Sequence, residues 1–145
     1  INITMLVDFN IKEQLKELFQ VNNPALVYAP DFQNQFDKYI NNLEKKIPLS
    51  YYGKWVYFPW LSTLVHILEE KDFQLVRTAR NQNLIDKDEQ GRFYNAVIGI
   101  AGMSIGNSVA LAIVLQGGGR HIKIADFDRL ALSNTNRVRA GVQNL

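Results

Sequence analysis

The sequence predicts an α/β fold in which a small α+β region precedes an incomplete βαβ unit. The first part of the chain alternates helical apolar periodicity with short runs of aromatic and β-branched residues. Two apolar runs near the end, residues 96–101 and 121–125, flank a glycine turn and an apolar helix. We place the boundary at about residue 90, which gives an α+β extension over residues 1–90 and the first part of the βαβ unit over residues 91–145.

The composition favours a folded protein and argues against several partners. Apolar residues make up 47% of the chain and charged residues 21%, a balance typical of a globular core. The formal net charge of +2 is too small for a protein that binds the phosphate backbone of nucleic acid. The chain has no cysteine, which fits a reducing compartment, and no apolar run of the roughly 18–20 residues that a membrane span needs. We therefore expect a cytoplasmic protein with no nucleic-acid or membrane partner.

Helical spacing recurs twice in the first third of the chain. Apolar residues from Ile11 to Phe19 are separated by charged ones, which predicts a short amphipathic helix. A short strand is expected over residues 26–29. A second helix should follow, with Asp31 as its N-cap and Pro48 marking its end. Its apolar face consists of Phe32, Phe36, Ile40, Leu43 and Ile47.

A strand pair is predicted in the middle of the chain. Residues 55–60 and 63–68 are rich in aromatic and β-branched types, with a break at Pro59, so we expect two short antiparallel strands. Two tryptophans lie in the first of them, and core packing is a better interpretation of these rings than stacking on a base. His66 has no second histidine or carboxylate at ligand spacing and is interpreted as structural.

Two helices are expected before the βαβ unit. The pattern over residues 69–81 is helical. Asp86 and Glu89 match a capping box, in which the first side chain caps the helix and the second reaches back. The helix that they start should run to about Tyr94.

The βαβ unit contains the residues that point to a ligand. Its first strand is a continuous apolar run, as expected for a parallel strand buried on both faces. Residues 102–106 should form a tight turn and residues 107–116 an apolar helix. The three glycines at 117–119 should end that helix, because glycine adopts the left-handed conformation without steric cost. The second strand then ends at Asp126.

Nucleotides bind at the edge of such a unit where both parallel strands end. Backbone N–H groups at the helix N-terminus can hold phosphate, and glycine at positions 102 and 106 lets a ligand approach closely. Asp126 lies 24 residues after Gly102, near the spacing at which a carboxylate accepts hydrogen bonds from ribose hydroxyls. The sequence therefore predicts a nucleotide site formed by Gly102, Ser104, Gly106 and Asp126.

A serine hydrolase is the main rival interpretation of the same turn. Gly102, Ser104 and Gly106 also match the G-x-S-x-G nucleophile elbow between a strand and a helix. That fold requires an acid and then a histidine after the serine, whereas His121 precedes Asp126. No such triad closes within these residues. NAD-dependent oxidoreduction remains a further alternative, since dehydrogenases share the glycine turn.

The end of the chain resembles a known family. Gly102 to Gly106, the Asp-Phe-Asp run at 126–128 and the Leu-Ser-Asn-Thr-Asn-Arg run at 132–137 are similar to signatures of ThiF, MoeB and ubiquitin-activating proteins. Upstream, residues 77–81 and 88–90 resemble that family's R-Y-x-R-Q and E-x-Q-x-x-L segments. The preceding region is similar to the extension found before ThiF modules that are fused to nitroreductase-like domains in bacteria. The chain would then hold only the N-terminal part of a ThiF-type Rossmann-like domain.

The resemblance implies an ATP-dependent adenylyltransferase. With ATP and Mg²⁺ as cofactors, such an enzyme transfers AMP to the carboxylate of a protein or small molecule and releases pyrophosphate. The implied ATP-binding residues are Gly102, Ser104, Gly106, Asp126, Asp128, Asn134 and Arg137. The implied catalytic residues are Arg137 and, acting across a homodimer, Arg80. Asp128 can equally cap the following turn, and Arg80 can equally complement a helix end.

One departure from the family leaves a second function open. The family's loop has the form G-x-G-G-x-G, whereas Met-Ser-Ile separates Gly102 from Gly106 here, so the loop is shorter and bulkier. A non-catalytic nucleotide-binding or dimerisation module, fused to a nitroreductase-like flavin domain, is therefore the alternative. No metal site made by the chain's own side chains is predicted.

Overall fold

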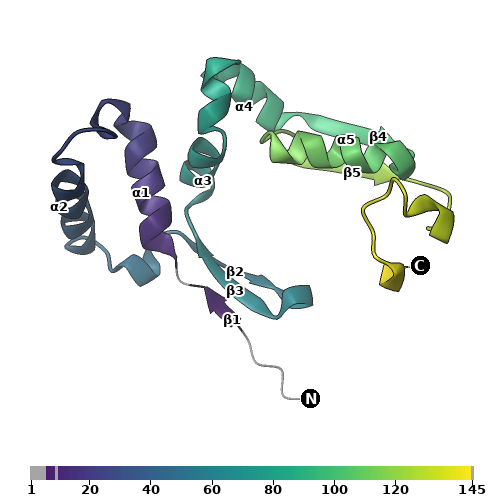
Figure 1. Cartoon of the computed structure of the whole chain (residues 1–145), viewed down its shortest axis with the longest axis horizontal. Helices are drawn as coiled ribbons and strands as arrows, with labels where there is room; N and C mark the ends of the chain where they lie inside the picture. Colours follow the sequence, from purple (N-terminus) through teal and green to yellow (C-terminus); the bar gives the residue numbers. More distant parts are fainter. Residues whose placement is uncertain (1–5, 9, 145) are drawn as a thin grey trace. The chain divides into compact units, whose positions relative to one another are not determined.

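Helices and small sheets alternate along the chain, which is a mixed α/β protein (Figure 1). The structure is a computed structural model and describes residues 6–8 and 10–144. The chain divides into two compact units, Ile1–Ala79 and Arg80–Leu145. The sequence analysis placed the boundary at about residue 90, whereas this division lies before the helix that precedes the βαβ unit.

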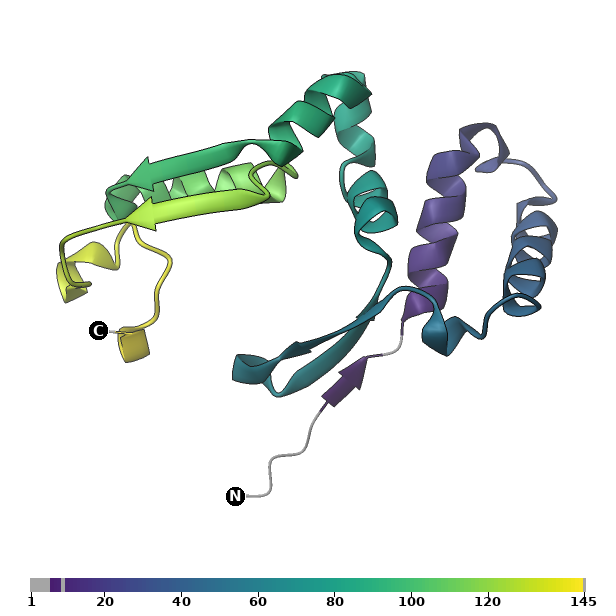
Figure 2. The same cartoon turned by 180° about the vertical axis from the view of Figure 1, so that it is seen from behind.

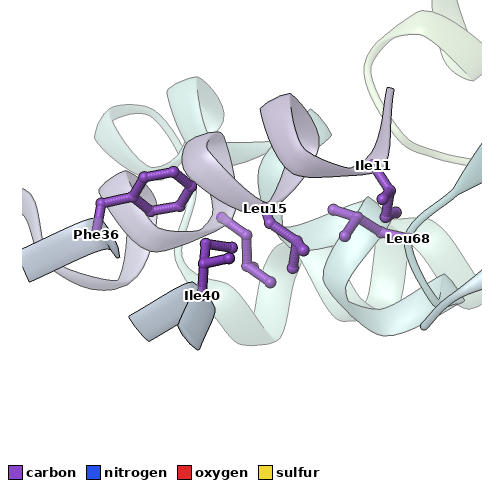
Figure 3. Close-up of a cluster of buried hydrophobic side chains, with 6 residues drawn as sticks. Ile11, Leu15, Phe36, Ile40 and Leu68 are labelled. Carbon is purple, nitrogen blue, oxygen red and sulfur yellow. The ribbon is translucent and has the colours of Figure 1, made fainter. Parts of the chain in front are cut away.

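The first unit is built around two amphipathic helices, α1 (Ile11–Asn22) and α2 (Phe32–Glu44), as the apolar spacing predicted, although α2 ends before Ile47 and not at Pro48. Their apolar faces meet in a buried cluster, which Figure 3 shows. Its members are Ile11, Leu15, Leu18, Phe36, Ile40 and Leu68. Burying aliphatic side chains of this size contributes roughly 1.5–3 kcal/mol each. The first unit therefore has a hydrophobic core of its own.

A three-stranded sheet completes the first unit. It consists of β1 (Leu6–Asp8), β2 (Lys54–Phe58) and β3 (Thr63–Ile67), in the order β1-β3-β2. β2 and β3 are antiparallel, which confirms the predicted strand pair, and Pro59 lies in the 3-10 turn that joins them. His66 is fully buried, stacks on Trp55 at a centroid distance of 4.3 Å and donates from Nε2 to the Tyr52 carbonyl. Its surroundings are those of a structural residue.

One local prediction in the first unit is wrong, and a second is confirmed in position but not in its hydrogen bond. The expected strand at 26–29 is instead a 3-10 helix, Pro24–Leu26, followed by a turn. Local hydrogen bonds explain this, because the Leu26 N–H donates to Asn23 O at 3.0 Å and the Ala29 N–H to Leu26 O at 2.9 Å. Asp31 does stand at the start of α2, but its carboxylate accepts from the Gln35 side chain at 2.6 Å and makes no capping bond to the backbone.

Short helices lead into the second unit: α3 (Glu70–Arg77), the 3-10 segment η4 (Ala79–Asn83) and α4 (Lys87–Asn95). The capping box of α4 is confirmed. The Glu89 N–H donates to the Asp86 carboxylate at 2.8 Å, and the Asp86 N–H donates to the Glu89 carboxylate at 2.9 Å. Two of the backbone N–H groups at the start of this helix, which have no partner within the helix, are thus satisfied.

The second unit contains the predicted strand-helix-strand. β4 (Val97–Ala101) and β5 (His121–Ala125) are parallel and in register, joined by α5 (Met103–Leu115), which lies along one face of the pair (Figure 2). The expected burial of β4 on both faces is wrong for the described residues. Val97 is 64% exposed, and along β4 exposed residues alternate with half-buried ones, as in a strand that is covered on one face.

The glycines at the end of α5 form the predicted left-handed cap. The Gly118 N–H donates to Ile113 O at 2.9 Å and the Gly117 N–H to Val114 O at 3.0 Å, the bond pattern of a Schellman motif. Gly117 has a φ of +74°. The predicted start of this helix at residue 107 is wrong. α5 begins at Met103.

Within the part of the chain that the structure describes, no helix is long and apolar enough to cross a membrane.

Candidate functional site

The two parallel strands of the second unit end side by side, and the candidate site lies beyond them. Ala101 pairs with Ala125, and the Gly102 N–H donates to Ala125 O at 2.8 Å. Asp126 follows directly and accepts a hydrogen bond from the Met103 N–H at 2.6 Å. The structure therefore brings the glycine turn and Asp126 together at one edge, as the βαβ frame predicted.

The Asp126 carboxylate is held by backbone donors. Its Oδ2 accepts from Met103 N–H and its Oδ1 accepts from Asp128 N–H at 3.0 Å. These bonds stabilise the charged form and lower the pKa of the carboxyl below its ordinary value, although the side chain is exposed. The carboxylate also lies at the positive end of the α5 dipole. Asp126 is thus an ionised acceptor fixed in direction at neutral pH.

The two glycines of the turn have different roles. Gly102 adopts a φ of +84°, a conformation that favours glycine, and turns the chain from β4 into α5. Gly106 is buried in the helix, and a Cβ there would lie 2.7 Å from Ile100 Cγ2. The prediction that Gly106 belongs to a phosphate-binding turn is therefore wrong. It allows the helix to pack closely on β4.

Arg137 ties the segment after β5 to the start of α5. Its Nε donates to Ser104 Oγ, and its Nη1 donates to Ser133 O at 3.1 Å and to Asn136 Oδ1 at 3.0 Å. All three acceptors are uncharged, so the positive charge of the guanidinium is not neutralised by them. Asn134 accepts from the Ala131 N–H at 2.7 Å and so closes the 3-10 turn η5 (Leu132–Asn134).

A cavity of about 190 Å³ lies between these groups. It brings together five of the predicted site residues, namely Ser104, Asp126, Asp128, Asn134 and Arg137. It is also lined by Met103, Arg129, Leu130 and Val138, which the sequence analysis did not single out. Sequence analysis missed Met103 because this residue contributes its backbone N–H. Every residue except proline has such a group, so the residue type does not reveal the role. Arg129 could have been found from its place directly after the acidic run.

Arg80 lies away from this cavity. It is exposed in η4, next to Asn81, whose side-chain amide donates to Gln116 O at the opposite end of α5, at 3.0 Å. A helix of 13 residues spans about 20 Å. Arg80 therefore does not join the cavity of its own chain.

The motif residues near Arg80 have a structural role. Asn81 donates to Gln90 Oε1 at 2.8 Å, and Gln90 donates to Gly117 O at 3.2 Å. Together with the bond to Gln116 O, these amides satisfy carbonyls at the C-terminus of α5, which lack partners inside the helix.

The donor set at the cavity fits magnesium only with help from a nucleotide. The described residues contain no group of three or more His, Cys, Asp or Glu side chains that could hold a metal ion. Mg²⁺ in nucleotide sites typically uses one or two carboxylates together with phosphate oxygens. Asp128 lines the same cavity as Asp126, and no described residue bonds its carboxylate, so it could supply one such ligand.

The hydrolase interpretation finds no support in the geometry. Ser104 lies inside α5 and its hydroxyl contacts Arg137, with no histidine among the residues that line the cavity. His121 pairs with Val97 at the other end of the strands.

Comparison with known proteins identifies one distant relative. The chain is 32% identical over 123 residues to "Uncharacterized protein MT1398" of Mycobacterium tuberculosis (strain CDC 1551 / Oshkosh). The match covers 83% of this chain and 17% of that protein, so the chain spans about a sixth of the relative's length. No family model matches the chain, and no solved structure matches it.

Proposed function

We propose that β4, α5 and β5 begin a Rossmann-like domain of the ThiF type that binds ATP and adenylates a carboxylate. The observation that carries this proposal is the meeting of Asp126 with the N-terminus of α5 in one cavity with Arg137. Fold alone does not imply function, so the proposal rests on these groups together with the family resemblance of the sequence.

The ribose and the phosphates of a nucleotide each have a suitable partner at this edge. Asp126 is an ionised, oriented carboxylate that can accept hydrogen bonds from ribose hydroxyls with the remaining lone pairs of its oxygens. The first turn of α5 offers the amides of Ser104 and Ile105 to phosphate, where the helix dipole favours negative charge. Gly102 leaves space for the ligand, since nothing lies within 4 Å of a Cβ built there.

Arg137 would act on the chemical step. In adenylation, a carboxylate oxygen attacks the α-phosphorus of ATP, the bond from that phosphorus to the bridging oxygen breaks, and pyrophosphate leaves with the electron pair. Negative charge develops on the phosphate oxygens, and a guanidinium placed there stabilises the transition state more than the ground state. Arg137 retains its full charge for this role because its described partners are a hydroxyl, a carbonyl and an amide oxygen.

One observation favours the alternative, a nucleotide-binding module without catalysis. The Met103 N–H, first in the helix, already donates to Asp126 and is not available to phosphate. The turn therefore offers phosphate one amide fewer than it would if the Met103 N–H were free. ATP binding without pyrophosphate release, measured with a range of carboxylates, is the result that this alternative predicts.

The test is the ATP affinity of the wild-type protein and of Asp126→Ala, measured by titration calorimetry. We expect the substitution to weaken ATP binding roughly tenfold to hundredfold, the effect of losing a charged hydrogen-bonding partner. Asp88→Ala is the matched control, because it removes an exposed carboxylate from the first turn of α4, outside the cavity. Equal ATP affinity of Asp126→Ala and wild type would reject the proposed site.

A further inference from the structure

A second, larger cavity adjoins the candidate nucleotide site. Its volume is about 630 Å³, and it shares Arg137 and Val138 with the first cavity. Arg139, Ser108 and Asn136 also line it. Arg137 therefore stands at the junction between the two cavities.

The two cavities differ in charge. The first is lined by Asp126, Asp128, Arg129 and Arg137, whose formal charges cancel. The second is lined by Arg137 and Arg139, with no acidic side chain among its described lining residues. Arginine is suited to phosphate because its planar, always charged fork offers several N–H donors. The second cavity has the chemistry of an anion site.

The remaining polar groups of the second cavity can also donate. No described residue pairs with the Arg139 guanidinium, which is exposed. The Asn136 side chain uses its Oδ1 as an acceptor for Arg137, which leaves its NH₂ group for another partner. Ser108 contributes a hydroxyl from the second turn of α5.

Size gives an independent reason for a ligand to extend into this cavity. Pockets that enclose a small-molecule ligand typically measure about 300–1,000 Å³, whereas the first cavity holds about 190 Å³. A ribose with one phosphate is a better match to that volume than a whole nucleoside triphosphate. The remaining phosphates would extend beyond Arg137, and the positively charged second cavity lies on that side.

We infer that the second cavity binds the terminal phosphates of the nucleotide and that Arg139 is a phosphate-binding residue of this site. The inference rests on the proposed function, since it takes the ribose to be at Asp126 and the α-phosphate near Arg137. It adds a direction to the nucleotide, which would run from the first cavity, whose charges cancel, into the positively charged second cavity. It also assigns Arg139 a role that neither the glycine turn nor the acidic run requires.

The experiment compares the binding of ATP, AMP and inorganic tripolyphosphate by calorimetry in wild type, Arg139→Ala and Arg139→Lys. Loss of the guanidinium should weaken ATP and tripolyphosphate binding about tenfold or more and leave AMP binding unchanged, and lysine should restore part of the loss. Arg92→Ala is the matched control, because Arg92 is an exposed arginine of α4 that lines neither cavity. Circular dichroism melting verifies that each variant is folded.

The outcomes separate the inference from the proposed function. Wild-type ATP affinity in Arg139→Ala, or an equal loss of AMP and ATP affinity, overturns the role of Arg139 in binding the terminal phosphates and leaves the proposed function standing. If wild type binds tripolyphosphate through Arg139 but does not bind ATP, the anion site stands and the proposed function fails. If wild type binds none of the three ligands, both are overturned.

Discussion

Asp126 is the residue on which the account of the site depends. Its carboxylate serves as a hydrogen-bond acceptor for two backbone N–H groups and, in the proposal, for a ribose. The same bonds make its ionisation depend on the fold. The family resemblance implied the ribose role, but the bond to Met103 could not be read from the sequence, because it joins a side chain to an amide 23 residues away.

The titration of Asp126 follows from these bonds. The hydrogen bond from Met103 N–H, and next that from Asp128 N–H, lower the pKa of Asp126 in the folded protein. We expect its side-chain carboxyl carbon to titrate in NMR spectra below the ordinary aspartate value of about 3.9. Because the folded pKa is lowered, the stabilisation is present above the unfolded pKa and is lost as the pH falls through the folded pKa. A midpoint at or above the ordinary value would show that the backbone bonds are not made in solution.

At the scale of elements, sequence patterns predicted correctly those features that depend on contacts between residues close together in the chain. The apolar spacing of α1 and α2, the capping box of α4 and the glycine cap of α5 all depend on residues within one or two turns, and all are found. The strand expected at 26–29 failed because an apolar run does not reveal whether a partner strand exists. Gly106 was assigned to the turn because the sequence does not show how closely a helix packs on a strand.

Glycine substitutions test this packing. A Cβ at Gly118 would overlap the ring of Phe93, so Gly118→Ala should lower the free energy of unfolding by about 1–3 kcal/mol. Gly91→Ala is the control, because nothing lies within 4 Å of a Cβ at this position inside α4, and alanine should stabilise a helix interior by about 0.5–1 kcal/mol. Denaturant unfolding of both variants measures the difference. Two substitutions with equal effects would contradict the described packing of Gly118.

At the scale of the whole molecule, the homodimer proposal depends on the position of Arg80. The resemblance implied a homodimer in which Arg80 serves the neighbouring site, and the distance along α5 shows that Arg80 does not reach the cavity of its own chain. Sequence reasoning could place Arg80 in a motif but not on a surface, because its position depends on how η4 packs at the far end of α5.

A mixing experiment tests the homodimer proposal. Arg80→Ala and Asp126→Ala proteins should each be inactive in ATP-dependent adenylation. Mixed in equal amounts and allowed to exchange subunits, they should regain about a quarter of wild-type activity, because half of the dimers are mixed and each of these has one intact site. No recovery, with subunit exchange verified, would exclude a role for Arg80 across the dimer.

The most direct test of the nucleotide site uses the Met103 amide. The chain contains two methionines, Met5 and Met103, so ¹⁵N-methionine labelling gives two amide resonances, one of which reports on the site. Because Met103 N–H donates to the carboxylate that we propose binds ribose, its resonance should shift progressively as ATP is added. A Met103 resonance that stays in place at saturating ATP would contradict the account.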